Sequence, residues 1–280
     1  MLSADDRQQY RTQGYLIRPI LSAAEVGQYL DAIDAALAPR NARARMINLQ
    51  FLQPGKDVRA IQTIICQPTI HAVIGDLLGG GQIVIDGASL FCAQAGVDYR
   101  QGWHRDLMQI PDEEIDPAWF SAAHLHNYVQ VNLALGIDRC LWLVPGSHRR
   151  PFDAAERALF GNSQKMASLD AGELPAGKQI VLQPGEAAFY NNNAVHRGYG
   201  GVLPQRRVTI HLGFHSTAHA PTPHFGVLDR DEYTPEYLAS LDANVSAMLQ
   251  RHLAERARHP RMDFYHARHQ EFIAKEFATK

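Results

Sequence analysis

The sequence predicts a mainly β protein with flanking helices. From residue 82 onward, short β-prone runs are separated by turn sequences such as Pro145-Gly146 and Pro184-Gly185, with no helical pattern between them. Before residue 82, and again after Pro223, apolar residues recur at helical spacing. Many short strands without intervening helices indicate a sandwich or barrel, and not a parallel α/β sheet.

The first part of the chain is expected to be mostly helical. Capping boxes at Ser3-Ala4-Asp5-Asp6 and Ser22-Ala23-Ala24-Glu25 each begin a helix, and a short strand is expected between them at 15–18. A third helix begins at Thr69 and ends at Gly79-Gly80-Gly81. Residues 39–58 show no clear period and are expected to be irregular.

The β-rich part and the C-terminal part follow in order. Strands are expected at 82–85, 89–93, 127–135, 141–144, 179–182, 187–190 and 207–214. Gly198-Tyr199-Gly200-Gly201 is expected to be a turn, and Thr234-Pro235 begins an apolar helical stripe that ends before Pro260. The simplest organisation is one domain over 1–280, with a helical N-terminal part (1–81), a β core (82–220) and C-terminal helices (230–280).

Composition narrows the class of partner. A net charge of −2 and a pI near 6.7 argue against nucleic acid or an anionic membrane, which leaves a small molecule. The three cysteines are odd in number and widely spaced, so a disulfide framework is not expected. There is no signal peptide pattern and no apolar window long enough for a membrane helix. We therefore expect a cytoplasmic protein, and the sequence makes no prediction of its oligomeric state.

The segment Gly102-Trp103-His104-Arg105-Asp106 contains the first candidate for chemistry. With 14 histidines in 280 residues, about one His-x-Asp pair is expected by chance, so the pair needs its context. On an extended segment His104 and Asp106 face the same way and can converge on one ion. His196, which follows a predicted strand in a turn-rich stretch, is the candidate third ligand. Two histidines and one carboxylate form a facial site for non-haem Fe(II).

Arg207 lies eleven residues after His196, at the start of an alternating strand. On that strand Arg207, Thr209 and His211 share one face, and a guanidinium there can grip a carboxylate bidentately. Arg206 is the rival for this role. Gln130 and Asn132 alternate with apolar neighbours on another expected strand. Their shared face is a candidate for the interior of the barrel, where Asn132 is a candidate contact of the oxo acid.

The chain resembles the phytanoyl-CoA dioxygenase-like family of Fe(II)/2-oxoglutarate-dependent oxygenases. The matching pieces are Trp103-His104-Arg105-Asp106, Val144-Pro145-Gly146-Ser147-His148, His196 and Arg207. The resemblance covers most of residues 3–215. It departs from the family at Asp138-Arg139-Cys140-Leu141, where an acidic residue followed by Asn-Gly is often found. We interpret that loop as structural.

The resemblance implies a double-stranded β-helix (jelly-roll, cupin-like) core. It implies that His104, Asp106 and His196 bind Fe(II), and that Arg207 binds the C5 carboxylate of 2-oxoglutarate. Gln130, Asn132 and Thr209 are further candidate cosubstrate contacts because of the strand faces on which they lie. With O2 as the second cosubstrate, 2-oxoglutarate yields succinate and CO2 while a C–H bond of a small molecule is hydroxylated. Desaturation, epoxidation or ring rearrangement at the same site is the alternative, as is a metal-binding jelly roll or isomerase that needs no cosubstrate.

Substrate contacts are expected in the segment that follows the metal motif. From Leu107 to His126 the chain mixes apolar and acidic residues, as a lid over a site would. The candidate substrate contacts in this segment are Met108, Trp119 and Phe120. His211, on the strand that begins at Arg207, is a fourth candidate substrate contact. His148 is expected to stabilise its turn.

Overall fold

A computed structural model describes residues 1–38, 46–55, 58–106, 126–160, 167–168, 172–219 and 233–259. The strands are β1 Tyr15–Pro19, β2 Met46–Gln50, β3 Ile83–Ala93, β4 Asp98–Arg100, β5 Val129–Ala134, β6 Leu141–Leu143, β7 Lys178–Gln179, β8 Glu186–Tyr190, β9 His196–Val202 and β10 Arg207–Ser216. The helices are α1 Ala4–Gln13, α2 Ala23–Leu37, α3 Pro68–Leu78, α4 Ala154–Phe160, α5 Pro235–Ala239 and α6 Ala243–Arg258, with 3-10 turns η1 Arg59–Cys66 and η5 Ser147–Arg149.

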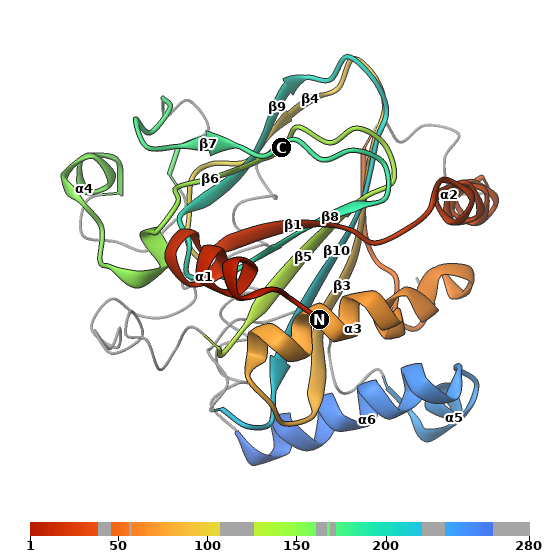
Figure 1. Ribbon diagram of the computed structural model, residues 1–280. Coiled ribbons are helices and arrows are strands. Elements are labelled where there is room, and N and C mark those ends of the chain that lie inside the picture. Colours follow the sequence, from red (N-terminus) through yellow and green to blue (C-terminus); the bar gives the residue numbers. More distant parts are fainter. Residues whose placement is uncertain are drawn as a thin grey trace.

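The strands form two antiparallel sheets (Figure 1). The large sheet has the order β1-β8-β5-β10-β3-β2, and the small sheet has the order β4-β9-β6-β7. A hydrophobic cluster joins them, with Leu141 and Leu143 from the small sheet packed against Ala134 and Tyr190 from the large one. We call this side of the large sheet its inner face. The expected double-stranded β-helix core is present.

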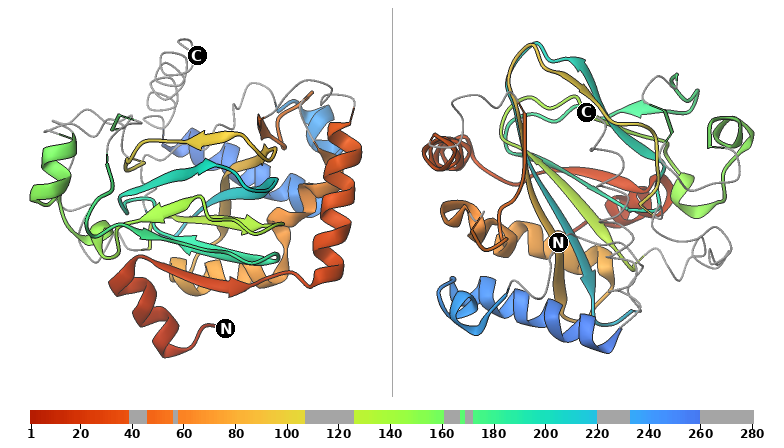
Figure 2. Two further views of the ribbon diagram at one scale, coloured as in Figure 1. Left: turned by 90° about the horizontal axis from the view of Figure 1, so that it is seen from above. Right: turned by 180° about the vertical axis from the view of Figure 1, so that it is seen from behind.

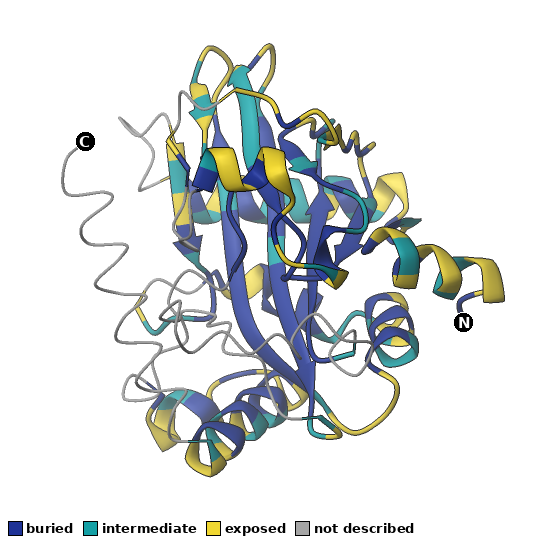
Figure 3. Cartoon of the chain, turned by 90° about the vertical axis from the view of Figure 1, so that its left-hand side faces the viewer, coloured by how far each residue is buried: buried dark blue, intermediate teal, exposed yellow. Residues whose placement is uncertain are grey.

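The other side of the large sheet packs on helices. Val208, Ile210, Leu212 and Phe214 alternate along β10 and belong to one buried cluster with side chains of α2, α3 and α6. α3 and α6 lie along this side (Figure 1), whereas α2 and α4 stand at opposite ends of the molecule (Figure 2). The central strands are buried and the exposed residues gather on the helices (Figure 3). The alternation on β10 therefore separates a helix-covered core from the inner face.

Both predicted capping boxes are confirmed. The Ser3 hydroxyl accepts from Asp6 N and the Asp6 carboxylate accepts from Ser3 N, and Ser22 and Glu25 repeat the arrangement. α1 ends at Gly14, whose φ of 81° suits glycine. α3 begins at Pro68 with Gln67 as its cap, one residue before the expected start.

Several strand predictions are wrong. Residues 46–50 of the segment expected to be irregular form β2, which adds to the edge of the large sheet. The two strands expected at 82–85 and 89–93 are one continuous strand. The C-terminal helices, in contrast, are present as expected, as α5 and α6. The predicted β core therefore extends beyond 82–220, because β1 and β2 come from the N-terminal part.

The glycine-rich stretch after His196 is a strand and not a turn. β9 pairs with β4 on one side and β6 on the other. A Cβ at Gly198 would approach Gln101 to 2.9 Å, and one at Gly200 would approach Leu203 to 2.7 Å. These glycines are therefore explained by close packing within a strand. The division of 1–280 as a single domain stays a prediction. Within the described part of the chain, each helix is too short or too polar to span a bilayer.

Candidate metal centre

His104 and His196 face each other across an isolated antiparallel bridge. His104 N donates to His196 O at 2.8 Å, and His196 N donates to His104 O at 2.9 Å. The imidazole centroids are 4.3 Å apart. Asp106 follows on the same extended segment, and its N–H donates to Asn192 O at 3.3 Å. The backbone thus holds the two predicted ligand segments side by side.

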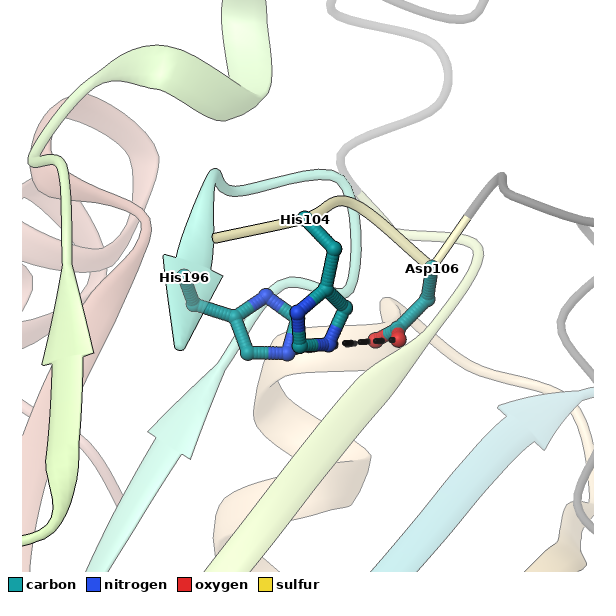
Figure 4. A group of neighbouring side chains, drawn as sticks. All are labelled: His104, Asp106 and His196. Carbon is teal, nitrogen blue, oxygen red and sulfur yellow. Dashed lines mark ion pairs between the residues drawn. The ribbon is translucent and has the colours of Figure 1, made fainter. Parts of the chain in front are cut away.

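The three side chains converge on one point (Figure 4). His104 Nε2 lies 3.7 Å from Asp106 Oδ1, and His196 Nε2 lies 3.6 Å from Asp106 Oδ2. All three residues are buried, and their ligand atoms lie within 4.8 Å of one another. Within the described ranges, no other group of histidine, cysteine and carboxylate side chains meets that distance.

Hydrogen bonds on the far side of each ligand fix its orientation. His104 Nδ1 lies 2.8 Å from Gly102 O and His196 Nδ1 lies 2.9 Å from Ala194 O. Since a carbonyl only accepts, each Nδ1 carries the proton and Nε2 is the metal-binding atom. Asp106 Oδ2 accepts from Gln130 Nε2 at 2.7 Å. Two imidazole nitrogens and one oriented carboxylate fit Fe(II) with coordination positions left for other ligands.

The turn at 145–148 supports the backbone next to His196. Ser147 Oγ donates to Val144 O at 2.6 Å and accepts from Val195 N at 2.8 Å, so the Pro-Gly-Ser-His turn holds the backbone beside the ligand. His148 is buried, and its Nε2 contacts Arg11 O at 3.2 Å, as expected for a structural residue. The ring of Tyr190 stands edge-on to His196. Burial, with the Asp106 charge, raises the pKa of Tyr190 well above its ordinary value, so it stays neutral.

The predicted cosubstrate anchor is buried on the inner face. Arg207 Cζ lies 4.5 Å from the ring centre of Tyr99 and 5.6 Å from that of Phe91. Its Nε donates to Asp138 Oδ2 at 2.9 Å, and Thr209 Oγ1 donates to the same oxygen. Burial alone would lower the pKa of Arg207, but the Asp138 carboxylate outweighs it and the net shift is upward. The rival Arg206 instead pairs with Asp34 of α2 at the surface.

Of the other predicted cosubstrate and substrate contacts, some lie near the site and some lie outside the described residues. Asn132 Oδ1 lies 2.5 Å from Nδ1 of the half-buried His211, whose ring packs near Phe91. Gln130 contacts Asp106, as described above. Met108, Trp119 and Phe120 lie outside the described residues.

Sequence reasoning missed the role of Asp138. It was noted only as a departure in a structural loop, yet its carboxylate contacts both predicted anchor residues. Burial would raise the pKa of Asp138, but the Arg207 charge and the bonds from Thr209 and Cys140 N lower it. In the sequence, Asp138 is an acidic residue three positions after the strand expected at 127–135.

A family model described as phytanoyl-CoA dioxygenase (PhyH) matches residues 10–207. The chain belongs to the phytanoyl-CoA dioxygenase family. It is accordingly a non-haem iron dioxygenase that depends on 2-oxoglutarate. No curated protein matches the chain significantly.

Solved structures share the fold of this phytanoyl-CoA dioxygenase family member at low identity. HygX from Streptomyces hygroscopicus, solved with nickel and 2-oxoglutarate, has a TM-score of 0.60 at 15% identity and covers 78% of this chain and 88% of its own. SnoK, a carbocyclase of nogalamycin biosynthesis, has a TM-score of 0.56 at 17% identity, and the match covers 77% of this chain and 84% of SnoK. EctD from S. alaskensis, solved with 2-oxoglutarate and 5-hydroxyectoine, has a TM-score of 0.55 at 19% identity, and the match covers 84% of this chain and 83% of EctD.

Proposed function

We propose that this enzyme hydroxylates a C–H bond of a small-molecule metabolite and releases succinate and CO2 from 2-oxoglutarate. The observation that carries the proposal is the convergence of His104, Asp106 and His196 in a barrel whose inner face also holds a buried arginine, Arg207. Bound Fe(II), with O2, supplies the oxidising chemistry that protein side chains lack. A pure metal binder has no need of a buried guanidinium on the same inner face.

Each residue has a distinct task in this proposal. His104, Asp106 and His196 hold Fe(II), and Gln130 orients the Asp106 carboxylate through its 2.7 Å hydrogen bond. Arg207 binds the C5 carboxylate of 2-oxoglutarate through charge-assisted hydrogen bonds. Asn132 and His211 form a hydrogen-bonded pair on the inner face, beside the partly exposed ring of Phe91. We assign this pair and the ring to cosubstrate and substrate binding, together with Met108, Trp119 and Phe120.

The substrate is inferred to be a small polar metabolite. A CoA thioester would favour a basic groove for its phosphates, and a net charge of −2 does not favour one. The three cysteines are free thiols, and the thiols of the two buried ones, Cys92 and Cys140, have pKa values raised by burial to about 11 and about 12. Such unreactive thiols suit the reducing cytoplasm that we propose as the location.

Turnover of the cosubstrate tests the proposal. Protein reconstituted with Fe(II) without air, then given 2-oxoglutarate, O2 and a panel of polar metabolites, is expected to release succinate, with one substrate accelerating the release. Absence of succinate with every substrate, from protein shown to have bound Fe(II), would refute the oxygenase assignment. The product's mass then separates two outcomes: addition of one oxygen atom means hydroxylation or epoxidation, which the NMR spectrum of the product distinguishes, whereas loss of two hydrogens means desaturation or ring closure. The second outcome is the alternative favoured by the similarity to SnoK, which is a carbocyclase.

A further inference from the structure

The carboxylate of Asp138 occupies the donors expected to receive the cosubstrate. Arg207 Nε donates to Asp138 Oδ2 at 2.9 Å, and Thr209 Oγ1 donates to the same oxygen. Cys140 N donates to Oδ1 at 2.8 Å. Asp138 and Arg207 are 3% and 4% exposed, so this pair is shielded from water.

Part of the guanidinium remains for another ligand. Arg207 Nη1 is buried and has no hydrogen-bond partner in the described part of the chain. Tyr99 and Phe91 flank the guanidinium with their rings and offer it no acceptor oxygen at hydrogen-bond distance. A buried guanidinium nitrogen without an acceptor is unfavourable, and an incoming carboxylate would satisfy it.

An incoming carboxylate would also meet an electrostatic penalty. Arg207 and Asp138 already form a neutral pair, so the C5 carboxylate of 2-oxoglutarate adds a second negative charge beside the buried Asp138 carboxylate. Two carboxylates that share one buried cation repel each other far more strongly than they would in water. Asp138 also engages Thr209, so the hydroxyl next to Arg207 is not available without a rearrangement.

We propose that Asp138 is a specificity-determining residue that weakens binding of the far carboxylate of 2-oxoglutarate by competing for Arg207 and Thr209. This inference rests on the proposed function, because it assumes that Arg207 is the cosubstrate anchor. In this proposal Asp138, which is not a metal ligand, sets the affinity for the cosubstrate. The electrostatic penalty requires the second carboxylate of the ligand, so an oxo acid that lacks this carboxylate serves as a matched control.

The test combines one isosteric substitution with two oxo acids. Wild-type protein and Asp138→Asn are loaded with Mn(II), and binding of 2-oxoglutarate and 2-oxovalerate is measured by calorimetry. 2-Oxovalerate has the same five-carbon chain and the same metal-chelating end, but it lacks the C5 carboxylate. Asp138→Asn is expected to bind 2-oxoglutarate about tenfold more tightly, with 2-oxovalerate changed less than about twofold. An unchanged ratio of the two affinities, or weaker 2-oxoglutarate binding in the variant, overturns the proposal.

Thermal unfolding of each variant guards against a folding defect. Asp138→Ser removes the same charge with a smaller side chain and keeps an acceptor for Cys140 N, so it replaces Asp138→Asn in the test if that variant does not fold. Asp138→Ser is likewise expected to raise the affinity for 2-oxoglutarate relative to that for 2-oxovalerate. A different result would contradict the proposed function itself. In that case wild-type protein loaded with Mn(II) binds 2-oxoglutarate no more tightly than 2-oxovalerate, and Arg207→Met changes neither of these two affinities.

Discussion

His104 and His196 are fixed to each other by their backbones before any metal is considered. Each donates its N–H to the other's carbonyl oxygen, at 2.8 and 2.9 Å, and their rings stand 4.3 Å apart. Because the bridge joins two distant parts of the chain, the spacing of the imidazoles is set by the small sheet and not by local sequence. The structure thus holds these two ligands in place in advance, and the two imidazoles are oriented by backbone carbonyls, whereas the Asp106 carboxylate is oriented by the Gln130 side chain.

Removing the carboxylate ligand should abolish metal binding. Asp106→Ala leaves two imidazoles, which are insufficient for a facial site, so both Mn(II) binding by calorimetry and succinate release should be lost. Asp98→Ala is the matched control, because Asp98 lies on β4 nearby but is exposed and paired with Arg100. Full activity in Asp106→Ala would refute the metal assignment.

Gln130 should matter for the metal and not directly for the oxo acid. Gln130→Leu removes the 2.7 Å bond to Asp106 Oδ2, so Mn(II) affinity should fall about 10–100-fold. Gln179→Leu, at an exposed glutamine on β7, should leave it unchanged. A variant with normal metal affinity but weakened 2-oxoglutarate binding would show that Gln130 contacts the cosubstrate, as the sequence pattern alone suggested.

The parts of the site that were predictable are those set by local periodicity. Alternation on β10 puts Arg207 and Thr209 on the face opposite Val208, and a two-residue spacing puts His104 and Asp106 on one side of an extended segment. The family resemblance, which rests on the order of motifs along the chain, then implied the jelly roll. These inferences need no knowledge of which strands pair.

What was missed depends on long-range pairing. β9 has low intrinsic β propensity because of its glycines, but hydrogen bonds to β4 and β6 on both sides override that preference. The Asp138 contact with Arg207 likewise requires the segment between β5 and β6, where Asp138 forms a bridge with Leu182, to lie beside the start of β10. β2 was missed because Met46–Gln50 has no alternation clear enough to separate it from a loop.

Ser147 should link the Pro-Gly-Ser-His turn to the metal centre. Ser147→Ala leaves the buried Val195 N–H without its acceptor, which should lower the free energy of unfolding by about 1–3 kcal/mol. The adjacent His196 should be held less firmly, so Mn(II) affinity should fall as well. Ser22→Ala also removes a hydroxyl that accepts a backbone N–H, but at the exposed start of α2. It should cost about 1 kcal/mol and leave Mn(II) affinity unchanged, whereas equal metal affinities in both variants would contradict the link.

A buried ion pair away from the metal should make stability depend on pH. Asp86 of β3 contacts His215 of β10 at 2.5 Å and His252 of α6 at 3.1 Å, and all three side chains are buried. Burial would raise the pKa of Asp86, but the His215 charge lowers it to about 2. Burial would lower the pKa of His215, but Asp86 raises it above 6.5. The pair therefore stabilises the fold fully between about pH 4 and 6.5.

The sign at each end of this window follows from the direction of each shift. The His215 contribution is lost as pH rises through its raised pKa, and the Asp86 contribution is lost as pH falls towards about 2. Asp86→Asn should thus lower the free energy of unfolding by about 3–5 kcal/mol at pH 5 and by clearly less at pH 9, measured by urea denaturation. Asp34→Asn is the matched control, because Asp34 is half-exposed and pairs with Arg206, which stays charged at both pH values. Its small effect should be the same at pH 5 and pH 9. An equal loss in Asp86→Asn at the two pH values would mean that the charge of His215 does not change between pH 5 and pH 9 in the folded protein, which would contradict the prediction.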